Sequence, residues 1–96
     1  MKRPCVYLLT NRPGGVLYVG VTSDLSKRLE EHRCGVVHGF SRRYNLHRLV
    51  WFELHERMEE AISREKALKK WKRSWKVELI ERENLSWRDL SETLGW

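Results

Sequence analysis

Hydrophobic positions come in short extended runs early in the chain and recur at helical spacing later. Two apolar runs, over about 4–10 and 16–21, flank Pro13-Gly14-Gly15, a combination typical of a β-hairpin. A third apolar and aromatic run, 49–54, predicts a largely buried strand. Together the three runs predict one three-stranded sheet.

Helical spacing follows the hairpin and the third run. Leu25 and Leu29 lie four residues apart, and Thr22-Ser23-Asp24 before them offers an N-cap. Ser86-Trp87-Arg88-Asp89 resembles a capping box that opens a short last helix. The predicted helices cover, in chain order, about 24–33, 56–71, 74–82 and 87–94.

Each strand of the predicted hairpin carries one tyrosine. If the loop has four residues, Tyr7 pairs with Gly20 and Leu9 with Tyr18, so both tyrosines share one face and Gly20 leaves space beside Tyr7. A five-residue loop would place the tyrosines on opposite faces. Their hydroxyls are therefore either polar edges of core side chains or members of one shared site.

Three further polar residues stand out on the predicted helices. Arg28 and His32 are four residues apart, so they are neighbours on one helix face, either solvated or functional. Glu65 falls inside an apolar stripe, where a carboxylate must be paired, protonated or bound to a cation. Lys69, four residues further on, is its candidate partner if the pair is purely structural.

The formal net charge of +6 comes entirely from one 13-residue stretch. Residues 64–76 hold seven basic residues against Glu65, whereas the rest of the chain has 12 basic and 12 acidic residues. Such a stretch suits a polyanion, with nucleic acid the first candidate. Trp71 and Trp75 lie within it, either as core residues or as stacking surfaces for bases. A basic loop with Arg42, Arg43 and Tyr44 could also contact phosphates.

The length indicates one small domain over residues 1–96, and the predicted strands and helices make its class α+β. The chain has no apolar run long enough to span a membrane and no signal peptide, so we expect a cytoplasmic protein without a membrane partner. Cys5 and Cys34 have no metal-ligand spacing and are expected to be reduced thiols, with Cys5 in the core.

Taken as an ordered set, these residues resemble the GIY-YIG nuclease superfamily, and most closely its small single-domain bacterial branch. The resemblance rests on Cys5-Val6-Tyr7 and Tyr18-Val19-Gly20, then Arg28, His32 and Glu65, and on the sequence Arg64-Glu65-Lys66-Ala67-Leu68-Lys69-Lys70-Trp71. It covers nearly the whole chain. Cys5 replaces the glycine of the first motif, and Val6 and Val19 replace isoleucines.

The resemblance implies a three-stranded antiparallel sheet flanked by helices, and phosphodiester hydrolysis with one divalent cation. Glu65 would hold Mg²⁺, for which Mn²⁺ can substitute, and Arg28 would stabilise charge on the phosphoryl oxygens. Tyr7 or Tyr18 would act as general base, with Tyr7 favoured, and His32 would orient a tyrosine or relay a proton. Asn84 is the late asparagine that either lies near the metal and the nucleic acid or ends a helix.

The leading hypothesis is therefore a metal-dependent DNA endonuclease with low sequence specificity or a preference for DNA structure, in DNA repair or processing. A protein partner could supply specificity, because the chain has no room for a recognition domain. A non-catalytic DNA- or RNA-binding module is the alternative, and a structural protein that docks an acidic partner is the third. The nucleic-acid contacts predicted for the first two are Arg42, Arg43, Lys66, Lys69, Lys70, Lys72, Arg73 and Asn84.

Overall fold

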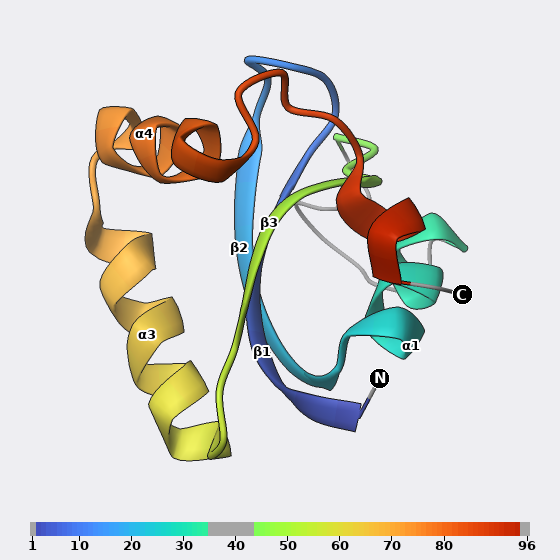
Figure 1. Ribbon diagram of the computed structural model, residues 1–96, viewed down its shortest axis with the longest axis vertical. Coiled ribbons are helices and arrows are strands. Elements are labelled where there is room, and N and C mark those ends of the chain that lie inside the picture. The colour runs from blue at the N-terminus through green and yellow to red at the C-terminus, as the bar shows by residue number, and fades with distance from the viewer. Residues whose placement is uncertain (1, 35–43, 95–96) are drawn as a thin grey trace.

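Three antiparallel strands form the centre of the fold. The computed structural model describes residues 2–34 and 44–94, and its strands are β1 (Lys2–Thr10), β2 (Leu17–Asp24) and β3 (Arg48–Leu54). The strand order is β2-β1-β3, so the first strand lies in the middle of the sheet (Figure 1). The predicted three-stranded antiparallel sheet is confirmed.

The pairing of β1 with β2 has the register that was predicted for a four-residue loop. Tyr7 faces Gly20 across the hairpin and Leu9 faces Tyr18. Gly14 has a φ of 71°, in the left-handed region that favours glycine, and the Gly15 amide donates to the Arg12 carbonyl at 2.9 Å. Both tyrosines therefore lie on the same face of the sheet.

Helices cover both faces of this sheet (Figure 1). The two that pack on one face are α3 (Met58–Lys70) and α4 (Arg73–Glu83). On the opposite face lie α1 (Leu25–Arg33) and the short 3₁₀ helix η1 (Leu90–Leu94). The α1 helix begins after Asp24, whose carboxylate accepts a hydrogen bond from the Lys27 amide at 3.3 Å.

The central strand separates two hydrophobic clusters. Because side chains alternate along a strand, Val6 and Leu8 face α3 and α4, whereas Cys5, Tyr7 and Leu9 face α1. All five side chains are buried, and the predicted core position of Cys5 is confirmed. Both cysteines are free thiols.

The end of the chain differs from the prediction. Trp87 has a φ of 59°, which an α-helix cannot include, so the last helix begins at Leu90 and is a 3₁₀ helix. The predicted capping box is therefore wrong. The Asp89 carboxylate instead accepts hydrogen bonds from the amides of Leu49 at 3.3 Å and Ser91 at 3.0 Å, which ties this segment to β3.

Asn84 requires a second correction. Its side chain is buried, and its Nδ2 donates to the carbonyls of Val50 at 3.1 Å and Arg88 at 2.9 Å. Its Oδ1 accepts from the Arg88 amide at 3.1 Å. Asn84 thus ends α4 and holds the following loop against β3, with its amide N–H groups and its carbonyl oxygen all bonded to backbone groups.

Two apolar side chains on the helices of one face are partly exposed. Ile62 on α3 is 36% exposed and Trp75 on α4 is 49% exposed, whereas Ile80 on α4 is fully buried. Trp51 and Trp87 are core residues, so tryptophan serves the core at some positions and the surface at another. In the described ranges no helix is both long and apolar enough to cross a lipid bilayer.

One arginine connects the start of α4 to the hairpin turn. Arg73 Nη2 donates to the carbonyl oxygens of Gly14 at 2.9 Å and Gly15 at 2.7 Å. This contact joins segments nearly sixty residues apart. Arg73, which was predicted to contact nucleic acid, therefore binds the backbone of the hairpin turn.

Candidate active site

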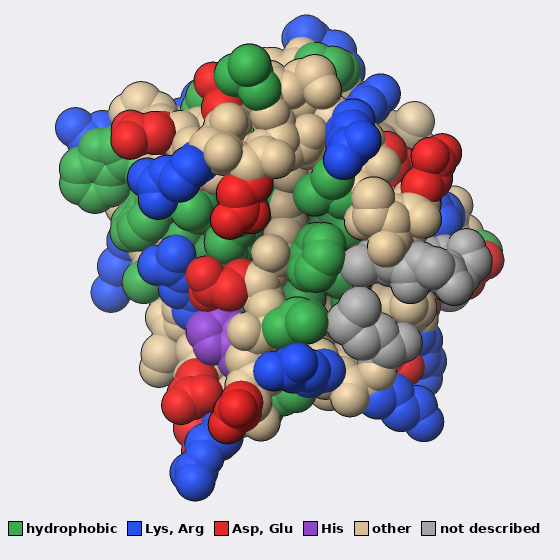
Figure 2. Space-filling model, viewed as in Figure 1, with side chains coloured by type: hydrophobic (Ala, Val, Ile, Leu, Met, Phe, Trp, Pro, Cys, Tyr) green, Lys and Arg blue, Asp and Glu red, His purple; other side chains and the backbone are tan. Residues whose placement is uncertain are grey.

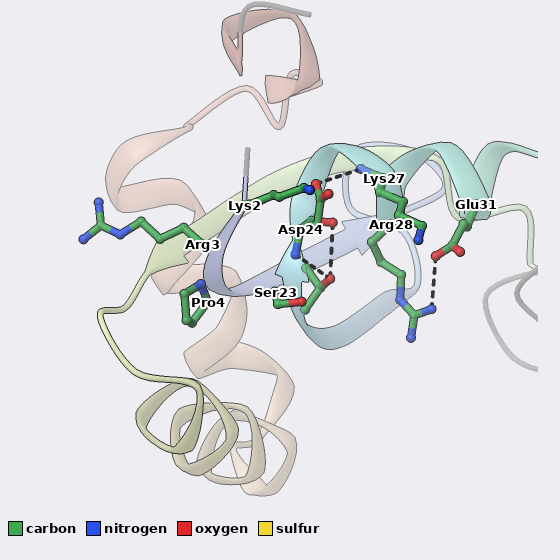
Figure 3. Close-up of a pocket in the computed structure, with 9 residues that line it drawn as sticks. Lys2, Arg3, Pro4, Ser23, Asp24, Lys27, Arg28 and Glu31 are labelled. Carbon is green, nitrogen blue, oxygen red and sulfur yellow. Dashed lines mark hydrogen bonds and ion pairs between the residues drawn. The ribbon is translucent and has the colours of Figure 1, made fainter.

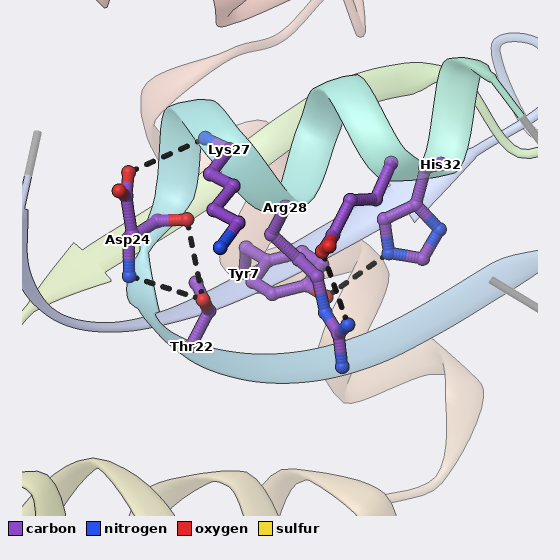
Figure 4. Close-up of polar contacts among 7 residues, drawn as sticks. Tyr7, Thr22, Asp24, Lys27, Arg28 and His32 are labelled. Atoms are coloured by element: carbon purple, nitrogen blue, oxygen red, sulfur yellow. Dashed lines mark hydrogen bonds and ion pairs between the residues drawn. The ribbon is translucent and has the colours of Figure 1, made fainter. Parts of the chain in front are cut away.

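A buried hydrogen bond joins the first tyrosine to the histidine of α1. Tyr7 Oη and His32 Nε2 are 3.1 Å apart, and the two side chains are 0% and 2% exposed (Figure 4). His32 lies on the inner face of α1 because it follows Leu25 by seven residues, two helical turns. The Arg28–His32 pair is therefore not a solvated helix face.

Tyr18 completes a cluster of three rings. Its ring centroid is 6.3 Å from that of Tyr7 and 5.4 Å from that of His32. The tyrosine rings can approach because Gly20 has no side chain: a Cβ there would overlap Cζ and Oη of Tyr7. Tyr18 keeps part of its surface exposed, unlike Tyr7.

Arg28 extends from α1 beside the Tyr7 hydroxyl (Figure 4). Its Nη1 contacts the Glu31 carboxylate at 3.3 Å, and its side chain is 39% exposed. Within the part of the chain that the structure describes, its buried Nε has no hydrogen-bond acceptor. A buried donor without an acceptor is costly, and the same guanidinium lies close enough to the Tyr7 hydroxyl to influence its pKa.

Burial controls the protonation of the tyrosine–histidine pair. It raises the pKa of the Tyr7 phenol far above the usual range, and the neighbouring Tyr18 adds to this, although the Arg28 guanidinium works in the opposite direction. Burial, followed by the Arg28 charge, lowers the pKa of His32 to about 4. At neutral pH the phenol is protonated and the imidazole is neutral, and the imidazole tautomer decides which of the two donates in the Oη–Nε2 hydrogen bond.

This lowered pKa predicts a loss of stability in acid. Above pH 6.5, the ordinary histidine pKa, His32 is neutral in both states, and its contribution is fully present. As the pH falls from 6.5 toward 4, the unfolded chain binds the proton first, which costs about 1.4 kcal/mol per pH unit and about 3 kcal/mol in all. Urea unfolding of wild type and His32→Gln at pH 7.5 and 4 measures this loss, and equal pH slopes for the two proteins would contradict it.

Glu65 lies apart from this cluster in the described contacts. It is on α3, which packs on the opposite face of the sheet from Tyr7, although α3 also contacts the edge strand β2. Its side chain is 12% exposed, and its carboxylate is 2.7 Å from the Lys69 ammonium. Glu65 therefore points inward, and its ion-pair partner is Lys69, the residue predicted for a purely structural pair.

The donor set can be tested against a divalent cation. No group of three or more His, Cys, Asp or Glu side chains that could hold a metal occurs in residues 2–34 and 44–94. Mg²⁺ nevertheless binds through one or two carboxylates while keeping several waters and using substrate phosphates. A single inward carboxylate at Glu65 fits that ion once Lys69 moves aside.

A pocket of about 520 Å³ adjoins Arg28 at the start of β1 and the end of β2 (Figure 3). Four basic residues line it, against the carboxylates of Asp24 and Glu31. Those basic residues are Lys2, Arg3, Lys27 and Arg28. The first three were not among the predicted nucleic-acid contacts, although the adjacent basic pairs Lys2-Arg3 and Lys27-Arg28 are visible in the sequence.

The remaining predicted contacts follow the α3–α4 corner. Lys66, Lys69, Lys70 and Lys72 are exposed, and Lys72 Nζ lies 4.9 Å from the centre of the Trp75 ring. Arg42 and Arg43 fall outside the described residues. The predicted residues therefore divide into a cluster of Tyr7, Tyr18, Arg28 and His32 on one face, and Glu65 with the basic stretch on another.

Comparison with known proteins identifies the class. The GIY-YIG catalytic domain matches residues 3–78 of the chain, a region that includes the tyrosine strands, Arg28, His32 and Glu65. The chain belongs to the GIY-YIG family of nuclease-type domains.

Within that family, the chain is similar to UPF0213 proteins. It is 38% identical to one from Clostridium perfringens over 69 residues, 72% of this chain and 74% of the relative. It is 35% identical to one from Haloquadratum walsbyi over 65 residues, 68% and 73% of the two chains. The solution NMR structure of a UPF0213 protein from Bacillus halodurans has 26% identity and a TM-score of 0.57, covering 94% of this chain and 95% of that one. The predicted superfamily and fold are confirmed.

Proposed function

We propose that this protein is a metal-dependent endonuclease that hydrolyses DNA phosphodiester bonds with low sequence specificity or a preference for DNA structure, in DNA repair or processing. One observation carries the proposal: in a member of a nuclease-type family, Arg28 holds a donor without an acceptor beside a buried Tyr7–His32 hydrogen bond. Free thiols at Cys5 and Cys34 fit the reducing cytoplasm.

Arg28 is the phosphate-binding residue of this proposal. Its planar guanidinium can direct two N–H groups at phosphoryl oxygens, and its charge offsets the negative charge that develops during hydrolysis. Its half-exposed side chain remains accessible from the pocket of Lys2, Arg3 and Lys27. Those neighbouring cations would hold flanking phosphates, which position DNA without reading its sequence.

Tyr18 is the phenol that a substrate water can reach, because Tyr7 has no exposed surface. We propose that Tyr18 contacts the attacking water. The rings of Tyr7 and His32 pack against the Tyr18 ring and would hold it in position. A phosphate bound by Arg28 would offset the guanidinium charge that lowers the pKa of His32. The imidazole would then become a better proton acceptor only when substrate is present.

Glu65 is the residue that would hold the divalent cation, Mg²⁺ or Mn²⁺. When bound, the ion would polarise a phosphate that reaches around the edge strand β2, which α3 contacts, and would stabilise the leaving oxygen. The Lys69 ammonium now at 2.7 Å would have to leave the carboxylate, and it would then be available to a DNA phosphate. A protein partner could add the sequence specificity that this small basic surface does not provide.

The test is cleavage of linear and branched DNA with Mg²⁺ or EDTA, comparing wild type with Glu65→Gln. We expect cleavage to need Mg²⁺ and to fall at least 100-fold in the variant, because loss of a ligating carboxylate removes the ion. Glu60→Gln, on an exposed turn of the same helix, is the matched control and should cleave normally. Equal cleavage by Glu65→Gln and wild type would refute the assignment of Glu65.

The same assay separates the two tyrosines. Tyr18→Phe should lose cleavage while remaining folded, whereas Tyr7→Phe should retain part of it and lose stability because the buried His32 nitrogen loses its partner. A larger loss of activity in Tyr7→Phe would reverse the assignment and return the base to Tyr7.

A non-catalytic DNA- or RNA-binding module is the second candidate. The Glu65–Lys69 ion pair favours it, since that pair gives Glu65 a structural use without any metal. Salt-dependent DNA binding without cleavage in Mg²⁺ or Mn²⁺ would select this candidate over the endonuclease.

A further inference from the structure

Two tryptophans meet at the corner between α3 and α4, on the opposite face of the sheet from Tyr7. The rings of Trp71 and Trp75 are edge-to-face, with centroids 6.0 Å apart. Trp75 is 49% exposed although its neighbours Val77 and Leu79 pack against the core cluster. An indole so exposed gives up much of the free energy that burial would provide, which indicates a use at the surface.

The tryptophans border a hollow. Trp71, Trp75, Glu78 and Arg82 line a space of about 360 Å³, large enough for one nucleobase. Figure 2 shows hydrophobic side chains gathered among lysine and arginine side chains over the α3–α4 corner. The hollow thus combines aromatic walls with a polar rim.

Cations lie over both rings. Lys72 Nζ is 4.9 Å from the centre of the Trp75 ring, and Arg64 Cζ is 5.3 Å from that of Trp71. Arg82, at the rim, is 68% exposed, and its contact with Glu78 is a 3.8 Å surface pair of little strength. The hollow lies against the 64–76 stretch that carries the whole net charge.

We propose that this hollow is a stacking site for an unpaired base of a single-stranded nucleic acid. The base would stack on the face of Trp75 that Lys72 now covers, and the displaced Lys72 together with Arg82 would contact the phosphates on either side of it. Aromatic surfaces interleaved with cations are the chemistry by which proteins hold single strands. The site is separate from the proposed catalytic cluster and does not depend on hydrolysis.

Other occupants fit the hollow less well. An acidic peptide would find the cations, but its carboxylate side chains have no group that stacks on indole. Duplex DNA keeps its bases stacked on one another, so it could use the cations but not the Trp75 face. The exposed indole therefore distinguishes a single strand from both.

The experiment is fluorescence anisotropy of a labelled 12-nucleotide oligodeoxycytidylate with the whole protein, without metal. Trp75→Leu should weaken binding about tenfold, within the range seen when one stacking residue is removed. Trp75→Tyr should restore most of the affinity, because it restores an aromatic face. Leu85→Ala, which removes another exposed apolar side chain, is the control and should bind like wild type.

Salt dependence separates stacking from charge. Trp75→Leu should lower affinity at every salt concentration without changing the slope of log affinity against log salt, whereas Lys66→Glu with Lys70→Glu should reduce that slope. In wild type, titration with the oligonucleotide should shift the Trp75 indole N–H resonance in an NMR spectrum. That measurement does not require any variant to fold.

Three results would overturn the proposal. The first is an unchanged affinity of Trp75→Leu for the oligonucleotide. The second is a loss of affinity in Trp75→Leu that is equally large for a 12-base-pair duplex. The third is Trp75-dependent binding of a labelled polyglutamate peptide that is tighter than binding of the oligonucleotide. The last would identify an acidic protein partner. Because no cleavage is measured, failure of the endonuclease proposal would leave each of these results interpretable.

Discussion

Arg28→Lys should reduce DNA cleavage about 100- to 1,000-fold while changing DNA affinity little, the loss expected when one donor to a developing charge is removed. Lysine keeps the charge, but it cannot direct two N–H groups at a phosphate, and its ammonium is held on a flexible chain. The Nε donor that has no acceptor among the described residues would be lost with the guanidinium. Single-turnover cleavage rates with saturating protein measure this effect directly.

Arg33→Lys provides the matched control. Arg33 lies on the same helix, but its Nη2 donates to Ser91 Oγ at 2.7 Å, away from the tyrosines. The control should lose some stability and none of the single-turnover rate. An Arg28→Lys protein that cleaves at the wild-type rate would remove Arg28 from the proposed chemistry.

Gly20→Ala should strongly destabilise the fold. The new Cβ would overlap Cζ and Oη of Tyr7, a buried ring held between β2 and α1. Overpacking of this kind costs about 2–3 kcal/mol, which corresponds to a decrease in Tm of roughly 10–20 °C for a domain of this size. Thermal unfolding followed by circular dichroism would show it.

Two comparisons establish the cause. Gly14→Ala introduces a methyl group where nothing lies within 4 Å, so only its φ of 71° should cost stability, about 1 kcal/mol. Combining Gly20→Ala with Tyr7→Leu should cost less than the sum of the two changes, since removal of the ring removes the overlap. Strict additivity would show that the methyl group acts elsewhere.

The hairpin and its tyrosines were predictable because they depend on local geometry. A four-residue turn determines the pairing of Tyr7 with Gly20, and strand alternation then places Tyr18 on the same face. The spacing of Arg28 and His32 showed that they are neighbours. The spacing alone did not show that His32 is buried, because burial depends on which side of α1 packs on the sheet.

Features that depend on long-range packing were not predictable. Apolar residues surround much of α4, so periodicity could not show that Ile80 is buried while Trp75 is exposed. Asn84 resembled a family site residue, but its amide forms hydrogen bonds to the backbone of β3 and the next loop. Glu65 was expected inward and is, yet its separation from the tyrosines depends on which face of the sheet α3 covers, and residue spacing does not determine that face.

The position of β1 in the middle of the sheet has a consequence for synthesis of the chain. β1 and β2 can pair as soon as both have left the ribosome, but the other edge of β1 stays open until β3 emerges, which begins 24 residues after the end of β2. During that interval α3 and α4 do not yet exist, so Val6 and Leu8 have no helix to cover them. The nascent hairpin therefore exposes an unpaired strand edge and an apolar face, the two features that make a folding intermediate prone to aggregation.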